Sequence, residues 1–255
     1  MVKLRAMFSR KIKVCDAFGI PVYLDFSLII LLVLFVMDFG SFVYGLSFAL
    51  ALALSIVAHE LGHALTARAF GYHTRDITLS LLGGCASLIA LPRKAWQEFL
   101  TAIAGPAVSF VISGLAWLSL NFLPVDNKWT VLVLYYTMWM NFVLGCFNLL
   151  PGFPMDGGRV FRSVASVFTT RTKATYIAMI VGRGFAILLA LRGLHSIVTG
   201  GAWGFISILI AWMIWREGWR EYQMAFMEER ARDWSARVSP PPYGGDGDEV
   251  EIRED

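Results

Sequence analysis

Residues 53–70, with the sequence ALSIVAHELGHALTARAF, decide the fold. They continue an apolar run that carries no charged side chain from Phe39 to Ala58. About 20 predominantly apolar residues are enough for a helix that spans a membrane. Two imidazoles and a carboxylate nevertheless follow before the helix ends, although hydrocarbon penalises such groups strongly. These polar side chains therefore indicate a functional site.

The spacing of the polar residues is typical of a metal site. His59 and His63 are four residues apart, so on a helix they share one face and can bind the same ion. Glu60 lies beside them, where a general base is needed to take a proton from water. This is the H-E-x-x-H pattern of zinc proteases. The alternative, a structural histidine pair, leaves the buried Glu60 unexplained.

A catalytic zinc ion needs a third protein ligand. The candidate is Asp156, in the stretch NLLPGFPMDGGRV at 148–160. Two prolines break the preceding helix there, and the sequence predicts flexible backbone around Asp156 and the two glycines that follow it. Irregular backbone near a membrane is tolerated where it lines a wet cavity. The alternative is a turn carboxylate without a metal.

The composition indicates a chain that is mostly dissolved in lipid. Of its 255 residues 57% are hydrophobic and only 16% are charged. Three widely spaced cysteines, with no C-x-x-C, argue against a disulfide framework or a cysteine zinc site. The net charge of +3 gives no reason to expect nucleic acid as a partner. No small-residue cleavage site closes the first apolar run, so we expect that run to be retained.

The predicted fold class is an all-α polytopic membrane protein with about six transmembrane helices, or five if the first is half-inserted. The expected spans are residues 23–37, 39–70, 99–123, 131–150, 176–198 and 203–215. Residues 1–215 would form the transmembrane domain, 216–238 a cytoplasmic or interfacial amphipathic helix, and 239–255 a disordered acidic tail.

Lysines and arginines alternate between the two sides of the predicted spans. Five precede the first span, four lie between the second and third, and one lies between the third and fourth. The positive-inside rule therefore predicts that both termini lie in the cytoplasm. The expected location is the cell membrane, plasma or inner. The second and fourth spans then run in the same direction, which places His59 and Asp156 at the same depth.

Three motifs together resemble the site-2 protease family of intramembrane zinc metalloproteases: HELGH at 59–63, AGP at 104–106 and NLLPGFPMDGGR at 148–159. The resemblance covers roughly residues 15–220. It implies cleavage of a peptide bond within or near a membrane helix. One zinc ion would be held by His59, His63 and Asp156, with Glu60 as base and proton shuttle.

The same resemblance implies further partners and one more site residue. Asn148 would donate a hydrogen bond to the substrate carbonyl or oxyanion; capping of the broken helix end is the alternative. The substrate would be a single-span membrane protein in the lipid bilayer. A homo-oligomer is left open. Gly105 and Pro106 are expected to serve packing and a kink in the third span.

Residues 78–91, TLSLLGGCASLIAL, resemble the small membrane-associated β-hairpin of this family. Gly83 and Gly84 would form its two-residue turn. Gly83, Gly84 and Cys85 are candidate substrate-binding residues, because an exposed strand edge could hold a substrate extended by β-addition. The alternative is a short re-entrant loop.

Two other functions remain open from the sequence. A membrane zinc protease of the prenyl-protein or stress type also carries H-E-x-x-H but expects a glutamate as third ligand, for which Glu98, Glu217 and Glu221 are the plausible donors. A non-catalytic metal-binding chaperone or transporter is the other. Arg183, inside the fifth span, is expected to snorkel to the cytoplasmic surface, with a substrate contact as the alternative.

Overall fold

The computed structural model describes residues 11–237, except residues 27, 30–32, 34–35, 37–40, 81–82, 89–91, 93, 125 and 202–203. The predicted acidic tail lies outside the described residues. The elements in chain order are β1 (Lys11–Ala17), β2 (Ile20–Asp25), α3 (Phe42–Ala69), β3 (Thr74–Ser80), β4 (Gly83–Leu88), α4 (Ala95–Phe122), α5 (Lys128–Asn148), α6 (Asp156–Ala165), α7 (Arg171–Val198) and α8 (Gly204–Arg237).

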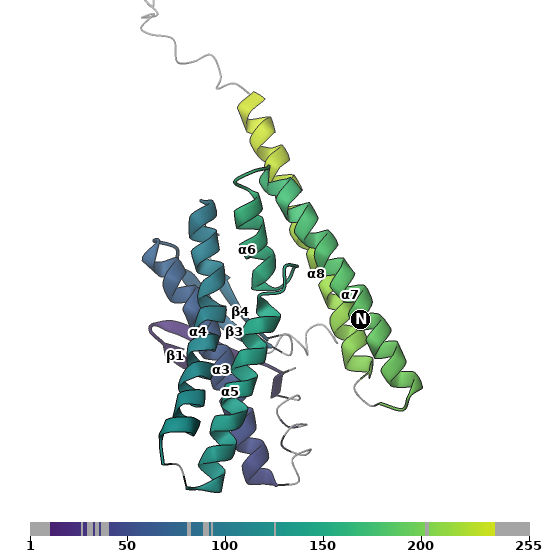
Figure 1. The fold of residues 1–255 in the computed structure, drawn as a ribbon. Coiled ribbons are helices and arrows are strands. Elements are labelled where there is room, and N and C mark those ends of the chain that lie inside the picture. Colours follow the sequence, from purple (N-terminus) through teal and green to yellow (C-terminus); the bar gives the residue numbers. More distant parts are fainter. Residues whose placement is uncertain are drawn as a thin grey trace, which may run out of the picture.

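The described part of the chain is mostly helical. Figure 1 shows α3, α4 and α5 as one bundle and α7 with α8 as a long hairpin, and the short α6 lies between α4 and α7. Four helices, α3, α4, α5 and α7, are long and apolar enough to cross a membrane. They coincide closely with four of the predicted spans, because a charge-free apolar run of about 20 residues has few other stable conformations.

The predicted first span, 23–37, is wrong at its start. Tyr23 and the two residues after it belong to β2, and most of the rest of that segment lies outside the described residues. The chain reverses from β1 to β2 at Phe18 and Gly19, both with positive φ (51° and 78°). This is the geometry of a tight hairpin turn that matches the twist of its strands.

The strands form one sheet in the order β1-β2-β3-β4. The two hairpins are antiparallel, and β2 pairs with β3 in parallel through Val22 and Ile77. Gly83 and Gly84 pair with Ser80 and Leu79 inside the second hairpin. The prediction that these glycines form the turn is therefore wrong: they are the first two residues of β4.

The sheet is fixed against the helix that carries the HELGH motif. Ile20, Val22 and Ile77 of the sheet form one buried cluster with Ile56 and Ala64 of α3. Burial of an aliphatic side chain of this size contributes about 1.5–3 kcal/mol. The cluster flanks His59 and His63 in the sequence of α3, so the sheet lies beside the polar part of this helix.

Asp156 is the first residue of α6 rather than part of a flexible loop, which corrects the prediction. The two glycines after it allow α6 to lie directly on the preceding loop. A Cβ added to Gly157 would lie 2.5 Å from the carbonyl carbon of Leu149, and one added to Gly158 would lie 2.7 Å from that of Gly152. The glycines thus serve close packing that places Asp156.

Segments 203–215 and 216–238 were predicted as two separate elements, but their described parts form one continuous helix, α8. The apolar part, 204–215, measures only about 18 Å along the helix axis. A helix that crosses the membrane therefore has to continue into the charged residues that follow. Near the turn between α7 and α8, a Cβ on Gly193 would lie 2.8 Å from the carbonyl oxygen of Gly204. The two helices therefore pack closely there.

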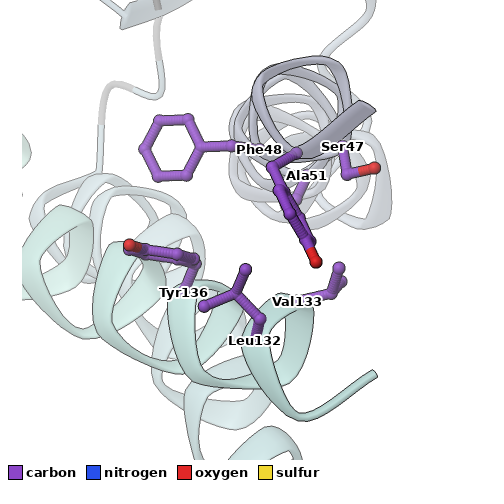
Figure 2. Close-up of a pocket in the computed structure, with 7 residues that line it drawn as sticks. Ser47, Phe48, Ala51, Leu132, Val133 and Tyr136 are labelled. Carbon is purple, nitrogen blue, oxygen red and sulfur yellow. The ribbon is translucent and has the colours of Figure 1, made fainter. Parts of the chain in front are cut away.

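A small apolar cavity lies between α3 and α5. Figure 2 shows the residues that line it, among them Ser47, Phe48 and Ala51 on α3 and Leu132 and Tyr136 on α5. His59 is eight residues beyond Ala51, which is about 12 Å along the helix. This cavity is therefore separate from the polar cluster of α3.

Candidate metal centre

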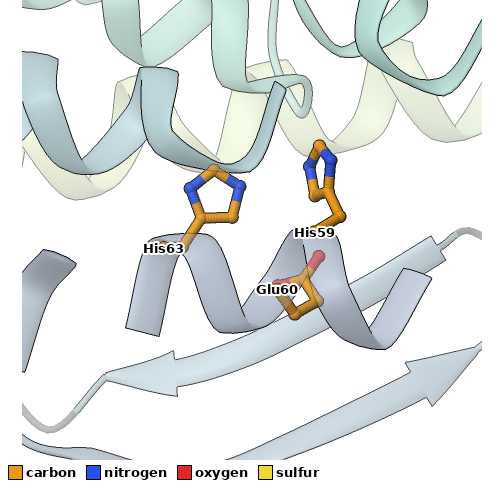
Figure 3. Close-up of side chains that lie close together, drawn as sticks. All are labelled: His59, Glu60 and His63. Carbon is orange, nitrogen blue, oxygen red and sulfur yellow. The ribbon is translucent and has the colours of Figure 1, made fainter. Parts of the chain in front are cut away.

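The three polar side chains of α3 are buried together. His59, Glu60 and His63 are 3%, 8% and 7% exposed. Their potential donor atoms all lie within 4.8 Å of one another. Figure 3 shows both imidazoles on the same side of α3, with Glu60 beside them. The four-residue spacing thus places both imidazoles on one face of the helix, as the helical period predicts.

Asp156 approaches both histidines from a distant part of the chain. Its Oδ2 lies 3.1 Å from Nε2 of His59 and 3.1 Å from Nε2 of His63. The three side chains come from two different helices, α3 and α6. The structure therefore brings together the three residues that the sequence predicted as ligands.

Helix α4 orients the two imidazoles through their other ring nitrogens. Nδ1 of His63 lies 2.7 Å from the carbonyl oxygen of Thr101, so this nitrogen carries the hydrogen and donates. Nδ1 of His59 lies 2.9 Å from Oγ of Ser109. Partners of this kind fix the tautomer and the ring direction of histidines that bind metals.

The resulting arrangement calls for a cation. With its hydrogen on Nδ1, a neutral His63 presents a lone pair from Nε2 to a carboxylate oxygen 3.1 Å away. Two facing acceptors repel each other unless a proton or a metal ion lies between them. Three such donor atoms from His59, His63 and Asp156 converge here, so one ion could satisfy all of them.

The donor set fits zinc. Two ligand atoms bonded to one tetrahedral zinc ion at about 2.0–2.2 Å are roughly 3.3–3.6 Å apart. The observed 3.1 Å separations differ from that by only a few tenths of an ångström. Two imidazole nitrogens and one carboxylate also match the ligands of catalytic zinc sites, which leave a fourth position open.

Gly105 of α4 makes the close approach of the imidazoles possible. A Cβ at this position would lie 2.7 Å from Nε2 of His59 and even closer to Nε2 of His63. Any side chain here would displace both rings. Gly105 is thus a packing residue, as predicted, and the side chains that pack on it are the two imidazoles.

Thr101 and Ser109 were not predicted from the sequence as partners of the histidines. A signal was present, because Thr101, Gly105 and Ser109 follow each other at four-residue intervals and so lie on one face of a helix. Two small polar residues around a glycine in an apolar helix are a weak pattern alone. It becomes informative only once this face is placed against α3.

Replacement of Ser109 by alanine tests the orientation of His59. We expect zinc affinity to fall about 10–100-fold, as is usual when such a supporting hydrogen bond is lost. The measurement is competition for zinc with a chromogenic chelator on the purified protein. Ser119→Ala is the matched control, because Ser119 lies on the same helix, is half-buried, and its hydroxyl donates to the carbonyl of Leu115. Equal zinc affinity in the two variants would contradict this role of Ser109.

Other predicted site residues lie elsewhere. Asn148 is the last residue of α5, and its amide donates to the carbonyl of Leu144 at 3.0 Å. Glu98 and Glu221 both form ion pairs with Arg162, and Glu217 pairs with Arg220. The glutamates considered as alternative third ligands are thus engaged with arginines.

The remaining candidates lie in the second hairpin and in α7. The register places Gly83, Gly84 and Cys85 in β4 opposite Ser80, Leu79 and Thr78. Arg183 stacks on two aromatic rings of α8, with its guanidinium carbon 4.5 Å from the ring centroid of Trp215 and 5.3 Å from that of Trp219.

These features define a class of protein: a helical protein with helices apolar enough to cross a membrane and, between its helices, a buried histidine-carboxylate cluster that could hold a metal ion. The sequence profile described as peptidase family M50 matches residues 47–129 and 124–191. The chain therefore belongs to peptidase family M50. Its resemblance to the site-2 proteases is thereby confirmed, and the rival assignment to another class of membrane zinc protease is set aside.

Individual relatives agree with this family. A protein of Synechocystis named as a candidate zinc metalloprotease is 36% identical over 253 residues, which are 92% of this chain and 65% of that protein. A zinc metalloprotease of Methanocaldococcus jannaschii is 32% identical over 237 residues, 91% of this chain and 67% of that one. The chain thus spans about two thirds of the length of these curated relatives.

A solved structure is also similar. The site-2 protease from Methanocaldococcus jannaschii superposes with a TM-score of 0.64 at 30% sequence identity. The match covers 84% of this chain and 95% of that one. The family, the zinc metalloprotease relatives and this fold together make the chain a member of a family of membrane zinc metalloproteases.

Proposed function

We propose that this chain is an intramembrane zinc metalloprotease that hydrolyses peptide bonds within or near transmembrane helices of membrane proteins. One observation carries the proposal: Oδ2 of Asp156 lies 3.1 Å from Nε2 of both His59 and His63. This convergence, next to helices long and apolar enough to cross a membrane, supports a zinc site with these three ligands. Single-span membrane proteins are the proposed substrates.

His59, His63 and Asp156 are the proposed zinc ligands, and Thr101 and Ser109 hold the two imidazoles in place. Zinc in such a site supplies Lewis acidity toward water and the scissile carbonyl. Glu60 accepts the proton of the attacking water and returns it to the leaving amine. Asn148 is the proposed hydrogen-bond donor to the oxyanion, which would require its amide to leave the carbonyl of Leu144.

Strand β4 is the proposed docking edge for the substrate. It lies at one end of the strand order among the described strands, so one of its edges has no strand partner there. Strands β3 and β4 both pack against α3, which carries the HELGH motif. A substrate helix hides its peptide bonds in internal hydrogen bonds, and pairing with Gly83, Gly84 and Cys85 would hold it extended for hydrolysis.

The six-span topology with both termini in the cytoplasm remains part of this proposal. The four apolar helices and the alternation of lysines and arginines support it. In this topology α3 and α5 both run toward the cytoplasm, and the metal centre lies near the cytoplasmic side of the membrane. Water and the cleaved fragment would then exchange with the cytoplasm.

The test is co-expression of this protein with candidate single-span membrane proteins, followed by mass spectrometry of the fragment termini. We expect new termini within or next to the transmembrane segment of a substrate, and none in cells that carry Glu60→Gln. Identical fragments from the wild-type and Glu60→Gln proteins would contradict the proposal. The proposal would also be contradicted if the wild-type protein purifies without zinc and binds none when zinc is added.

A further inference from the structure

A buried arginine lies on the same short helix as Asp156. Arg162 of α6 is 2% exposed, and its guanidinium reaches carboxylates on two other helices. Nε donates to Glu98 Oε1 of α4 at 2.8 Å, and Nη2 donates to the same oxygen. Nη1 donates to Glu221 Oε2 of α8 at 3.1 Å. Three of its nitrogens are thus engaged.

A second arginine completes the group. Nη1 of Arg171, at the start of α7, lies 2.9 Å from Oε2 of Glu98. We call Glu98, Arg162, Arg171 and Glu221 the Arg162 cluster. It joins α4, α6, α7 and α8, and its two positive and two negative charges balance. Loss of one member of such a buried cluster leaves an uncompensated charge, which is strongly destabilising.

The Arg162 cluster connects the two halves of the metal centre. Glu98 lies three residues before Thr101, one helical turn from the carbonyl that orients His63. Arg162 lies six residues after Asp156, about 9 Å along α6. The Glu98–Arg162 contact therefore ties the turn of α4 that directs one ligand to the helix that carries another.

Helix α6 depends on such outside contacts for its direction. It has ten residues, and isolated helices of that length are only marginally stable in water. Arg162 also lies over the ring of Phe153, with 4.9 Å between the guanidinium carbon and the ring centroid. Phe153 belongs to the loop that leads into Asp156. Arg162 thus fixes both α6 and the loop before it.

We propose that Arg162 is a positioning residue for the metal centre: through Glu98 it holds Asp156 against the His59–His63 pair. The planar guanidinium suits this role, because its donors form a rigid fork that sets an angle as well as a distance. This inference rests on the proposed function, since it assigns the cluster a purpose in zinc binding. A purely structural cluster would affect folding without affecting the affinity for zinc.

The experiment compares zinc affinity, by chelator competition, with the thermal stability of the zinc-free protein. We expect Arg162→Gln to lower zinc affinity about 10–100-fold, as for other residues that orient metal ligands. It should also change the visible absorption of the cobalt-substituted protein. Glu217→Gln is the matched control, because Glu217 pairs with Arg220 on the exposed side of α8. This control should leave zinc affinity and the cobalt spectrum unchanged.

The double variant Glu98→Gln, Arg162→Gln separates positioning from stability. It removes one charge of each sign, so the remaining pair stays neutral and much of the lost thermal stability should return. We expect its zinc affinity to stay low, because the rigid contact is still missing. Recovery of zinc affinity together with stability would overturn the inference. Wild-type affinity in Arg162→Gln would overturn it as well.

If Arg162→Gln does not fold, Arg162→Lys serves instead. It keeps the charge but replaces the fork by a single ammonium group. We expect near wild-type stability with several-fold weaker zinc binding, and unchanged zinc binding would overturn the inference. Wild-type protein that binds no zinc would remove the proposed function itself. If the wild-type protein binds zinc and the Arg162 variants bind it with the same affinity, only this inference is overturned.

Discussion

Glu60→Gln is expected to slow peptide-bond hydrolysis by roughly 10²–10⁴-fold while zinc remains bound, because general acid–base catalysis contributes rate enhancements of that size. Glutamine has nearly the same shape as glutamate but cannot take up the proton of the attacking water. The residue is 8% exposed and lies next to both histidines. The substitution therefore removes a negative charge beside the proposed zinc ligands and changes the side-chain volume very little.

The measurement is the initial rate of cleavage of a single-span substrate by purified protein in lipid nanodiscs, with zinc determined on the same sample. Glu217→Gln is again the control, since it removes a carboxylate from an exposed pair. A wild-type rate in Glu60→Gln would show that another group is the base. Loss of zinc would show that Glu60 binds the metal instead.

Gly105→Ala is expected to reduce both zinc affinity and hydrolysis by roughly 100-fold or more, because a displacement of about 1 Å at a catalytic centre costs on that order. The added methyl group would lie 2.7 Å from Nε2 of His59 and nearer still to Nε2 of His63. Both ligand atoms would have to move. The surrounding helices allow little movement, because protein interiors are closely packed.

Gly114→Ala on the same helix is the matched control for this substitution. A Cβ there meets no atom within 4 Å, so it should leave zinc binding intact. Alanine in a helix interior is also favoured over glycine by roughly 0.5–1 kcal/mol, so thermal stability should rise slightly. Full zinc occupancy in Gly105→Ala would show that the imidazoles adapt to the methyl group, contrary to the expectation.

The residues that meet at the metal centre could be predicted from the sequence, although their roles are still proposals. The helical period alone placed His59 and His63 on one face. The direction of the spans then put Asp156 at the same depth. Apolar run length set the bounds of α3, α4, α5 and α7 closely, because hydrocarbon permits few alternatives to a helix.

The parts that the sequence did not reveal depend on tertiary contacts. Helix α6 was missed because two glycines in its first turn argue against a helix, yet they are what allow it to lie on the loop. The β1–β2 hairpin was missed because its apolar residues run into the following apolar segment. The continuity of α8 was missed because its charge pattern changes abruptly at Arg216.

The parallel pairing of β2 with β3 has a consequence for biosynthesis. Val22 and its partner Ile77 are separated by α3, a helix long and apolar enough to cross a membrane. At about 5–20 residues per second, the ribosome needs roughly 3–11 s to make the intervening chain. Until then the edge of β2 that pairs with β3 has no strand partner, because β3 has not yet been made. Helix α6 is synthesised only after β3 and β4, so Asp156 can reach His59 and His63 only once all four strands have been made.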